Sequence, residues 1–319
     1  MSVLPVTLRY VRPALKAGLL PVWRDRDTLQ IGIDPRRAVA LTGMTGIAGV
    51  IGLLDGSRGR AQVIRAAIDR GVPADAAERV LALLATAGAL DDFPAGTLRV
   101  LSPPQRSRLA AELATASLAR RDGDGGARTL ARRLAARIRI HGGGRVGAGL
   151  AGLLTTSGIG GVTHADPPDA SPARPDLAVL IGRHPPELRA SLMHEQIPHL
   201  AASADEAIGV VGPLVVPGRT ACLRCLDLTR TDRDPAWPLI LAQLAGRKPD
   251  PLACDATLAA AVAAQAAAQV LDFTDRAAAA GAVTNGTLEL VLPGWQWRRR
   301  TWPRHRDCTC GSTTFSHEE

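Results

Sequence analysis

The stretch that decides the fold is Ile138-Arg-Ile-His-Gly-Gly-Gly-Arg-Val-Gly147. Its first four residues alternate apolar and polar side chains, which predicts a short strand. Gly142, Gly144 and Gly147 follow at the spacing of a dinucleotide-binding fingerprint and open a predicted helix. Such glycines permit a tight turn and let backbone N–H groups approach a phosphate. Equally, they can serve only to bring helix and strand close together, and the residues leave both interpretations open.

The sequence after this stretch alternates further strands and helices. The predicted strands cover residues 138–141, 162–165, 177–182 and 197–201, and the helices cover residues 146–157, 186–195 and 259–270. This alternation is typical of βαβ units on a mostly parallel sheet. A strand over residues 208–216 continues it as an antiparallel addition. We therefore expect an α/β, Rossmann-like domain over residues 137–319.

The nucleotide-type loop lacks the surroundings that ATP chemistry needs. Asp166 ends the second predicted strand, where an acid usually contacts a ribose hydroxyl. Only residues 167–176 separate it from the next strand, too few for a crossover helix. No lysine follows Asp166 before Lys248, whereas activation of a carboxylate by ATP requires neutralisation of a triphosphate. The sequence thus predicts a vestigial loop, with ATP not expected as a cofactor.

The first 92 residues form a separate predicted domain. A hairpin over residues 21–33 and a third strand over residues 37–42 precede three helices, over residues 46–54, 60–69 and 74–87. This is the order of parts in a winged helix. Residues 93–136 read as a helical linker with a weaker helix over residues 101–124.

Composition narrows the class of protein. The chain has 319 residues, 46% of them apolar, which suffices for two packed domains. It contains no 18-residue apolar run and no signal-peptide pattern, so we expect a cytoplasmic protein without membrane contact. The net charge is +8, and residues 105–145 carry ten arginines against three acids. Such a surface suits nucleic acid, a membrane or an acidic peptide, or is simply solvated.

Four of the five cysteines form two close pairs, Cys222-x-x-Cys225 and Cys308-x-Cys310. Four thiolates can surround Zn²⁺ in a closed tetrahedron, which predicts a structural zinc site. Two reduced thiol pairs, or a redox pair, are the alternatives. Cys254 precedes an Ala-rich helix, where its pKa could fall and make it a nucleophile. The alternative, which the residues favour, is a small cap-region or core residue, so no catalytic residue is assigned and Cys254 is the one weak candidate.

Two longer stretches carry a family resemblance. They are Val211-Gly-Pro-Leu-Val-Val-Pro-Gly-Arg-Thr-Ala-Cys-Leu-Arg-Cys-Leu226 and Trp295-x-Trp-Arg-Arg-Arg-x-Trp-Pro-Arg-His-Arg-Asp-Cys-x-Cys-Gly311. Together with the glycine loop they resemble ThiF-like, ubiquitin-activating-type proteins. The branch most similar is the leader-peptide-binding partner of YcaO cyclodehydratases in thiazole/oxazole-modified microcin biosynthesis. The likeness covers nearly the whole chain, including Leu53-Leu-Asp-Gly-Ser-Arg58 in the winged-helix part.

The resemblance implies a non-catalytic scaffold. Its N-terminal domain would bind the leader of a ribosomally made precursor peptide and present the peptide to a separate, ATP-using YcaO enzyme. The glycine loop, Asp166 and the four cysteines carry over from the family, whereas the ATP-clamping segment does not. The leader would add a strand to the third strand of the sheet and pack on the third helix. The implied contact residues are Arg36, Arg37, Val39, Leu41, Arg79, Val80, Leu83, Leu84 and Ala87. Pairing of two copies through the sheet domain is also implied.

Three other functions remain open at this point. An adenylating enzyme would activate a peptide carboxyl group with ATP. A winged-helix regulator would bind DNA, but the third helix carries only Arg79 among Ala and Leu, where several base-reading side chains are needed. An NAD-dependent oxidoreductase lacks an acid–base pair that we can place. We therefore expect a peptide and an enzyme as partners, and no nucleic acid.

Overall fold

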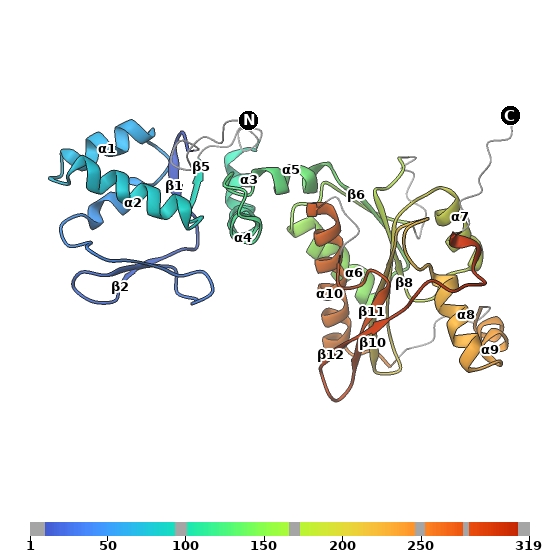
Figure 1. The fold of residues 1–319 in the computed structure, drawn as a ribbon. Coiled ribbons are helices and arrows are strands. Elements are labelled where there is room, and N and C mark those ends of the chain that lie inside the picture. Colours follow the sequence, from blue (N-terminus) through green and yellow to red (C-terminus); the bar gives the residue numbers. More distant parts are fainter. Residues whose placement is uncertain (1–9, 93–100, 166–172, 246–252, 277–280, 312–319) are drawn as a thin grey trace. The chain divides into compact units, whose positions relative to one another are not determined.

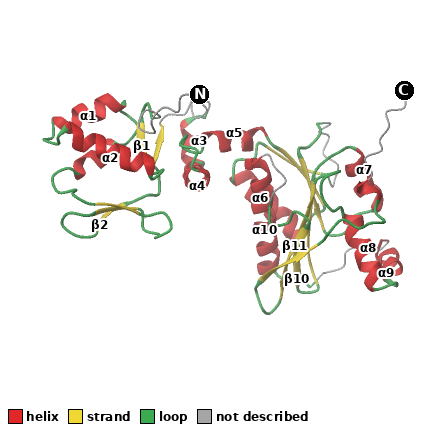
Figure 2. Cartoon of the chain, in the orientation of Figure 1, coloured by secondary structure: helices red, strands yellow, loops and turns green. Residues whose placement is uncertain are grey.

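A computed structural model describes residues 10–92, 101–165, 173–245, 253–276 and 281–311 (Figures 1 and 2). The chain divides into two compact units, Met1–Ala131 and Arg132–Glu319. Asp166 and most of the segment that follows it lie outside the described residues.

The first unit combines two small antiparallel sheets with helices. Strands β2 (Pro21–Trp23), β3 (Leu29–Ile31) and β4 (Val39–Leu41) form one sheet in that order, and β1 (Pro13–Leu15) pairs with β5 (Leu90–Asp92). The helical elements are η2 (Ala48–Leu53), α1 (Arg60–Ile68), α2 (Ala74–Thr86), α3 (Pro103–Arg108) and α4 (Ala110–Arg120). Apolar side chains of α1, α2 and η2 close over Leu29, Ile31 and Leu41 to form the core.

Two expectations for this unit need correction. The segment predicted as a helix over residues 46–54 forms the 3-10 helix η2, because Gly49 and Gly52 weaken α-helical propensity in so short a segment. The helix predicted over residues 101–124 is two helices, α3 and α4, separated at Leu109, whose backbone leaves the helical range.

A buried polar cluster ties α4 to the two-stranded sheet. The ammonium group of Lys16 donates to Asp91 Oδ1 at 2.5 Å and to Ser117 Oγ at 2.6 Å. The Ser117 hydroxyl in turn donates to Asp91 Oδ2 at 2.6 Å. Lys16 is one of only two lysines in the chain, so this burial removes it from any role in phosphate binding.

The second unit is built on a seven-stranded mixed sheet in the order β12-β11-β10-β9-β8-β6-β7. Strands β6 (Arg137–His141), β7 (Gly161–His164), β8 (Leu177–Ile181) and β9 (His199–Asp205) are parallel. The other three are antiparallel: β10 (Ile208–Val215), β11 (Gly286–Val291) and β12 (Trp297–Thr301). The sequence thus predicted the mixed α/β class correctly, with the parallel strands followed by an antiparallel addition.

Helices cover both faces of this sheet (Figure 1). On one face α6 (Gly144–Thr156) packs against α10 (Ala256–Arg276) over the larger core. On the other face lie α7 (Pro186–His194) and α8 (Leu223–Arg233), with α9 (Trp237–Ala245) packed against α8. A short 3-10 helix, η4 (Thr309–Gly311), lies near the end of the described chain, and α5 (Ala127–Ala135) crosses the boundary between the units.

Among the described helices, α10 alone is long and apolar enough to cross a membrane by length and composition. Its side chains Val262, Ala266 and Val270 are buried in the core of the second unit. The helix packs against α6 and β10, as expected of a core helix in a folded domain.

A buried ion pair joins α5 to α10 within the second unit and yields a first prediction. The Arg133 guanidinium donates to both carboxylate oxygens of Asp275 at 2.8 Å, and both side chains are buried. Asp275→Ala would remove the carboxylate that neutralises a buried positive charge, so it should lower the free energy of unfolding by roughly 3–5 kcal/mol. Urea denaturation measures this. Asp75→Ala, which removes the exposed partner of Arg79, should leave the midpoint unchanged, and equal midpoints for both variants would contradict the prediction.

Candidate functional site

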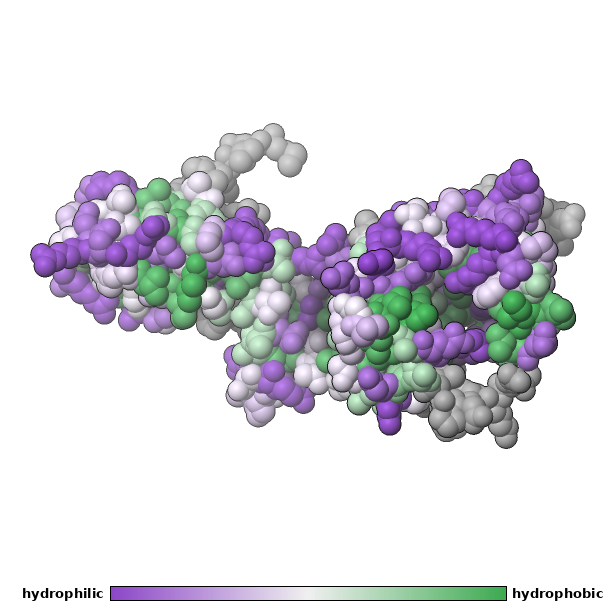
Figure 3. Space-filling model, turned by 90° about the horizontal axis from the view of Figure 1, so that it is seen from below, coloured by the Kyte–Doolittle hydropathy of each residue, from purple (hydrophilic) through white to green (hydrophobic). Residues whose placement is uncertain are grey.

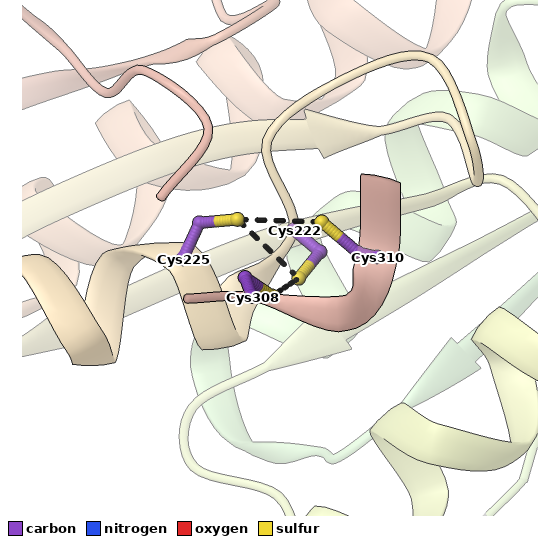
Figure 4. A group of neighbouring side chains, drawn as sticks. All are labelled: Cys222, Cys225, Cys308 and Cys310. Atoms are coloured by element: carbon purple, nitrogen blue, oxygen red, sulfur yellow. Dashed lines mark hydrogen bonds between the residues drawn. The ribbon is translucent and has the colours of Figure 1, made fainter. Parts of the chain in front are cut away.

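The two cysteine pairs meet in space, as their chemistry predicted (Figure 4). Cys222 caps the N-terminus of α8 and Cys225 lies in its first turn, while Cys308 and Cys310 come from the segment around η4. The sulfur–sulfur distances are 3.8 Å for Cys222–Cys225, 3.6 Å for Cys222–Cys308 and 3.4 Å for Cys225–Cys310. A tetrahedron with Zn–S bonds of about 2.3 Å places its sulfurs about 3.8 Å apart. The four cysteines can therefore bind a metal ion and are compatible with zinc.

The burial of the four cysteines is typical of a closed, structural metal centre. Cys222, Cys225 and Cys308 are buried and Cys310 is half-buried. Burial raises the pKa of Cys222 and raises the pKa of Cys310 to about 11. At Cys225 burial acts in the same direction, but hydrogen bonds to the backbone of His305 and Cys222 outweigh it and lower its pKa. A bound cation would stabilise thiolates that this environment otherwise keeps mostly protonated.

Zinc affinity should consequently depend steeply on pH. Binding must displace at least the protons of Cys222 and Cys310, whose raised pKa values keep them as thiols near neutrality. We expect the apparent affinity to fall by at least about 100-fold for each unit by which the pH drops below 8, one factor of ten per displaced proton. Competition with a chromophoric chelator between pH 6 and pH 8 measures this slope. A flat profile would show that the cysteines do not bind zinc as thiolates.

The glycine loop joins the end of β6 to α6, and its geometry explains three of its glycines. Gly142 and Gly144 have positive φ angles of 89° and 68°. A Cβ atom on Gly142 would collide with the Ile181 carbonyl oxygen of β8, and one on Gly147 would lie 3.1 Å from the Gly142 carbonyl oxygen. Close packing of strand and helix thus accounts for Gly142 and Gly147. Gly144 has open space around it, so its backbone conformation alone calls for glycine.

Three arginines of the second unit donate to backbone carbonyls. Arg145, which lies in the glycine loop region at the start of α6, donates to the Cys254 carbonyl at 3.1 Å in an exposed contact. Arg139 and Arg174 donate to the carbonyls of Ala173 and Glu195, residues that precede β8 and β9 in the chain.

Cys254 itself does not have the environment of an activated nucleophile. Burial raises its pKa, which outweighs the opposing effect of Arg145. This is the reverse of the lowering that the sequence suggested for a cysteine ahead of a helix.

The histidines next to the loop were given no role from the sequence, and the structure brings two of them together. The rings of His141, at the end of β6, and His184, after β8, lie edge to face with centroids 6.3 Å apart. Burial and the neighbouring His184 lower the pKa of His141 to about 4, so it is neutral at pH 7. The sequence places His141 directly before Gly142, and from this position its location beside the glycine loop could have been predicted.

The residues expected to contact a leader peptide divide into two groups. Val80, Leu84 and Leu41 are fully buried and belong to the core of the first unit. Leu83 is exposed on α2, Ala87 is exposed at the C-cap of this helix, and Val39 is half-buried on β4. Among the described residues, β4 pairs only with β3, so its other edge is unpaired. Core packing therefore accounts for Val80, Leu84 and Leu41, whereas Leu83, Ala87 and the outer edge of β4 are accessible among the described residues.

The arginines expected to meet acidic leader residues already have partners within the chain. Arg36 pairs with Asp34 at 2.7 Å, and Arg79 pairs with Asp75 one turn away on α2. Arg37 donates to the Leu118 carbonyl at 2.5 Å. All three are exposed, where such contacts are weak, so an incoming carboxylate could still compete for Arg36 or Arg79.

These features define a mixed α/β protein with a seven-stranded sheet and a four-cysteine centre compatible with zinc. No family model matches the chain, and no curated protein matches it. Solved structures do. A heterocyclase in complex with substrate and cofactor matches with a TM-score of 0.67 and 19% identity, over 94% of this chain and 40% of its own. The heterocyclase TruD matches with a TM-score of 0.65 and 20% identity, over 94% and 43%.

The MccB protein of E. coli matches over almost its full length. Its structure with ATP gives a TM-score of 0.62 and 16% identity, over 94% of this chain and 99% of MccB. At these identities the likeness establishes the fold, which is related to that of the heterocyclases and of MccB. The chain spans about two fifths of each heterocyclase.

Proposed function

We propose that the chain is a non-catalytic scaffold that binds the leader of a ribosomally made precursor peptide and presents it to a separate YcaO-type cyclodehydratase for azoline formation. One observation supports this most directly. The chain shares its fold over 94% of its length with heterocyclases of which it spans only 40% and 43%. Tethering the precursor to the scaffold would raise the effective concentration of the peptide at the YcaO-type enzyme.

The unpaired edge of β4 offers a backbone template for the leader. The Arg24 N–H donates to the Thr28 carbonyl, and the Gly32 N–H donates to the Leu20 carbonyl. These hydrogen bonds show which alternate residues of β3 direct their N–H and C=O groups toward β2. Because β4 pairs in register with β3, this alternation directs the N–H and C=O groups of Ala40 away from the sheet. An extended leader would pair with Ala40 and gain affinity from main-chain hydrogen bonds.

The contacts of three arginines of the second unit and of Lys16 favour a scaffold over an ATP-using enzyme. A triphosphate site needs positive charge aimed at the phosphates. Arg139 and Arg174 donate to carbonyls of residues that precede β8 and β9, Arg145 donates to the Cys254 carbonyl, and Lys16 is buried against Asp91 in the other unit. ATP is therefore not expected to be held by these residues, and the metal centre would serve structure.

A second candidate function is peptide adenylation. The full-length likeness to MccB, whose structures include complexes with ATP and with AMPCPP and MccA, is the observation that favours it. The two functions differ in whether the glycine loop binds ATP.

Fluorescence anisotropy with the labelled leader of the cognate precursor tests the proposal on the full, zinc-loaded chain. We expect saturable binding in the micromolar range, unaffected by added ATP. No binding at tens of micromolar protein would contradict the scaffold function. Strict dependence of binding on ATP would favour adenylation instead.

A further inference from the structure

Strand β12 lies at one edge of the seven-stranded sheet and is strongly basic (Figure 1). Among the described residues it pairs only with β11, so its other edge is unpaired. Residues 290–306, which include this strand, contain five arginines and no acid. The side chains of Arg298, Arg299 and Arg300 are exposed. Neither the peptide edge of β4 nor the four-cysteine centre makes use of this strand.

The positive charge of β12 is only partly balanced by its surroundings. Arg300 pairs with Glu289 of β11 at 3.2 Å. Arg299 donates to two backbone carbonyls just before β11, which fix its guanidinium without neutralising it. Arg298 has no acidic partner among the residues that the structure describes. Within this described part of the chain, the three cations of the strand therefore share a single carboxylate.

The backbone of β12 is oriented to accept another strand. The Trp302 N–H donates to the Asn285 carbonyl at 2.9 Å, so the backbone groups of Trp302 are directed toward β11. Successive residues of a strand direct their N–H and C=O groups to opposite edges. In the register of β11 with β12, those of Thr301, Arg299 and Trp297 are therefore directed to the unpaired edge. An extended segment that pairs there would gain affinity from main-chain hydrogen bonds.

The side chains of β12 determine which segment would fit. Arg298 lies opposite Glu289 and Arg300 lies opposite Thr287, so both arginines point to the same face of the sheet. A strand added beside them would place every second side chain on this face, where carboxylates would meet the guanidinium groups. A second copy of β12 would instead bring arginine against arginine, which destabilises pairing. The strand thus selects an acidic segment and rejects a copy of itself.

The hairpin that leads into β12 adds an apolar anchor. Val291 and Trp295 are 52% and 45% exposed. Trp295 also has a positive φ angle of 48°, a conformation that costs free energy in a non-glycine residue and that is common at binding sites. Figure 3 views the molecule from the side on which this hairpin ends in Figure 1, and it shows apolar side chains next to hydrophilic ones on the second unit. Tryptophan and arginine carry much of the binding energy in protein interfaces.

We propose that the outer edge of β12 binds an extended, acidic segment of the YcaO-type enzyme by strand addition. Carboxylates at alternate positions of this segment would lie beside Arg298 and Arg300, and an apolar side chain would cover Trp295. This inference rests on the proposed function, which requires the chain to hold an enzyme as well as a leader peptide. The leader would use β4 of the first unit and the enzyme would use β12 of the second unit, so the two partners would not compete for one strand.

Fluorescence anisotropy with a synthetic probe tests this on the full, zinc-loaded chain. The probe is a labelled peptide of about ten residues in which glutamate and valine alternate. We expect micromolar binding at low salt that weakens as the salt concentration rises. The same peptide with N-methyl groups on four consecutive central residues keeps its charge but cannot pair along either edge, so it should bind at least about tenfold more weakly. Lysine in place of glutamate should abolish binding.

Two substitutions locate the site on the chain. Arg298→Gln should raise the dissociation constant of the probe by at least about fivefold, because it removes a positive charge beside the bound carboxylates. Arg233→Gln, at an exposed arginine of α8, is the matched control and should have no effect. Trp295→Ala should weaken binding by a similar factor, whereas Leu239→Ala, at a side chain of α9 that is 64% exposed, should not. All four variants should unfold at the wild-type midpoint, because the replaced side chains are exposed.

Strand addition at β12 would be overturned by no binding of the probe, by equal binding of the N-methylated peptide, or by binding insensitive to Arg298→Gln. Tighter binding of duplex DNA with the same dependence on Arg298 would overturn it in favour of nucleic acid. If the probe binds but an excess of it does not displace the YcaO-type enzyme, the enzyme is not the occupant. Leader binding should be unaffected by Arg298→Gln, so a failure here leaves the scaffold function standing, whereas a wild-type chain that binds the probe and no leader would contradict the scaffold function instead.

Discussion

The double substitution Cys308→Ser and Cys310→Ser is expected to abolish stoichiometric zinc binding. It should also lower the free energy of unfolding of the second unit by about 5 kcal/mol or more. Two of four thiolate ligands are lost, and the free energy of metal binding contributes directly to folding. The remaining pair, Cys222 and Cys225, would stay buried without a cation to stabilise its thiolates. Elemental analysis gives the zinc content, and urea denaturation gives the stability.

Cys254→Ser is the matched control, because Cys254 lies outside the four-cysteine cluster. It should retain one zinc per chain and the wild-type midpoint. A double variant that keeps its zinc, or that loses zinc with no change in stability, would contradict a structural role for the centre.

Ala40→Pro is expected to weaken binding of the leader peptide by at least about 100-fold. Proline removes the outward N–H of β4 and places its ring where the incoming strand must pair. The fold should survive, because proline is tolerated at an edge position whose N–H makes no ladder hydrogen bond. Fluorescence anisotropy with the labelled leader measures the loss.

The control for this prediction changes the side chain at the same position and keeps the backbone donor. Ala40→Ser should bind within a few-fold of the wild type, and both variants should share its unfolding midpoint. If Ala40→Pro bound the leader as tightly as Ala40→Ser, the peptide would not use the edge of β4.

Local periodicity made much of the second unit predictable. Strands β6 and β8 and helices α6 and α7 follow regular apolar spacing bounded by glycine or proline. The four-cysteine centre was predictable although its pairs lie far apart in sequence, because two close thiol pairs in one chain usually share one ion. Both predictions depend on residue type and spacing, which a sequence displays directly.

Other features depend on contacts that a sequence does not display. The three-residue strands β1 and β5 are too short for any periodicity, and β12 reads Trp-Arg-Arg-Arg-Thr without alternation. Val80 and Leu84 looked like candidates for a binding face, but tertiary packing placed them in the core.

The hydrogen bonds of the basic residues could not be predicted from the sequence either. The sequence shows how many arginines surround the glycine loop, yet their hydrogen bonds reach distant carbonyls such as that of Cys254. Only the folded chain shows that Arg145 makes this contact, which is exposed.

Calorimetry of ATP binding to the zinc-loaded chain, with AMP release followed in parallel in the presence of the leader peptide, tests the central claim most directly. The scaffold function predicts no heat of binding and no AMP. Micromolar binding together with AMP release would contradict it, and would make Arg145, Asp166 and Cys254 the residues to test for adenylation.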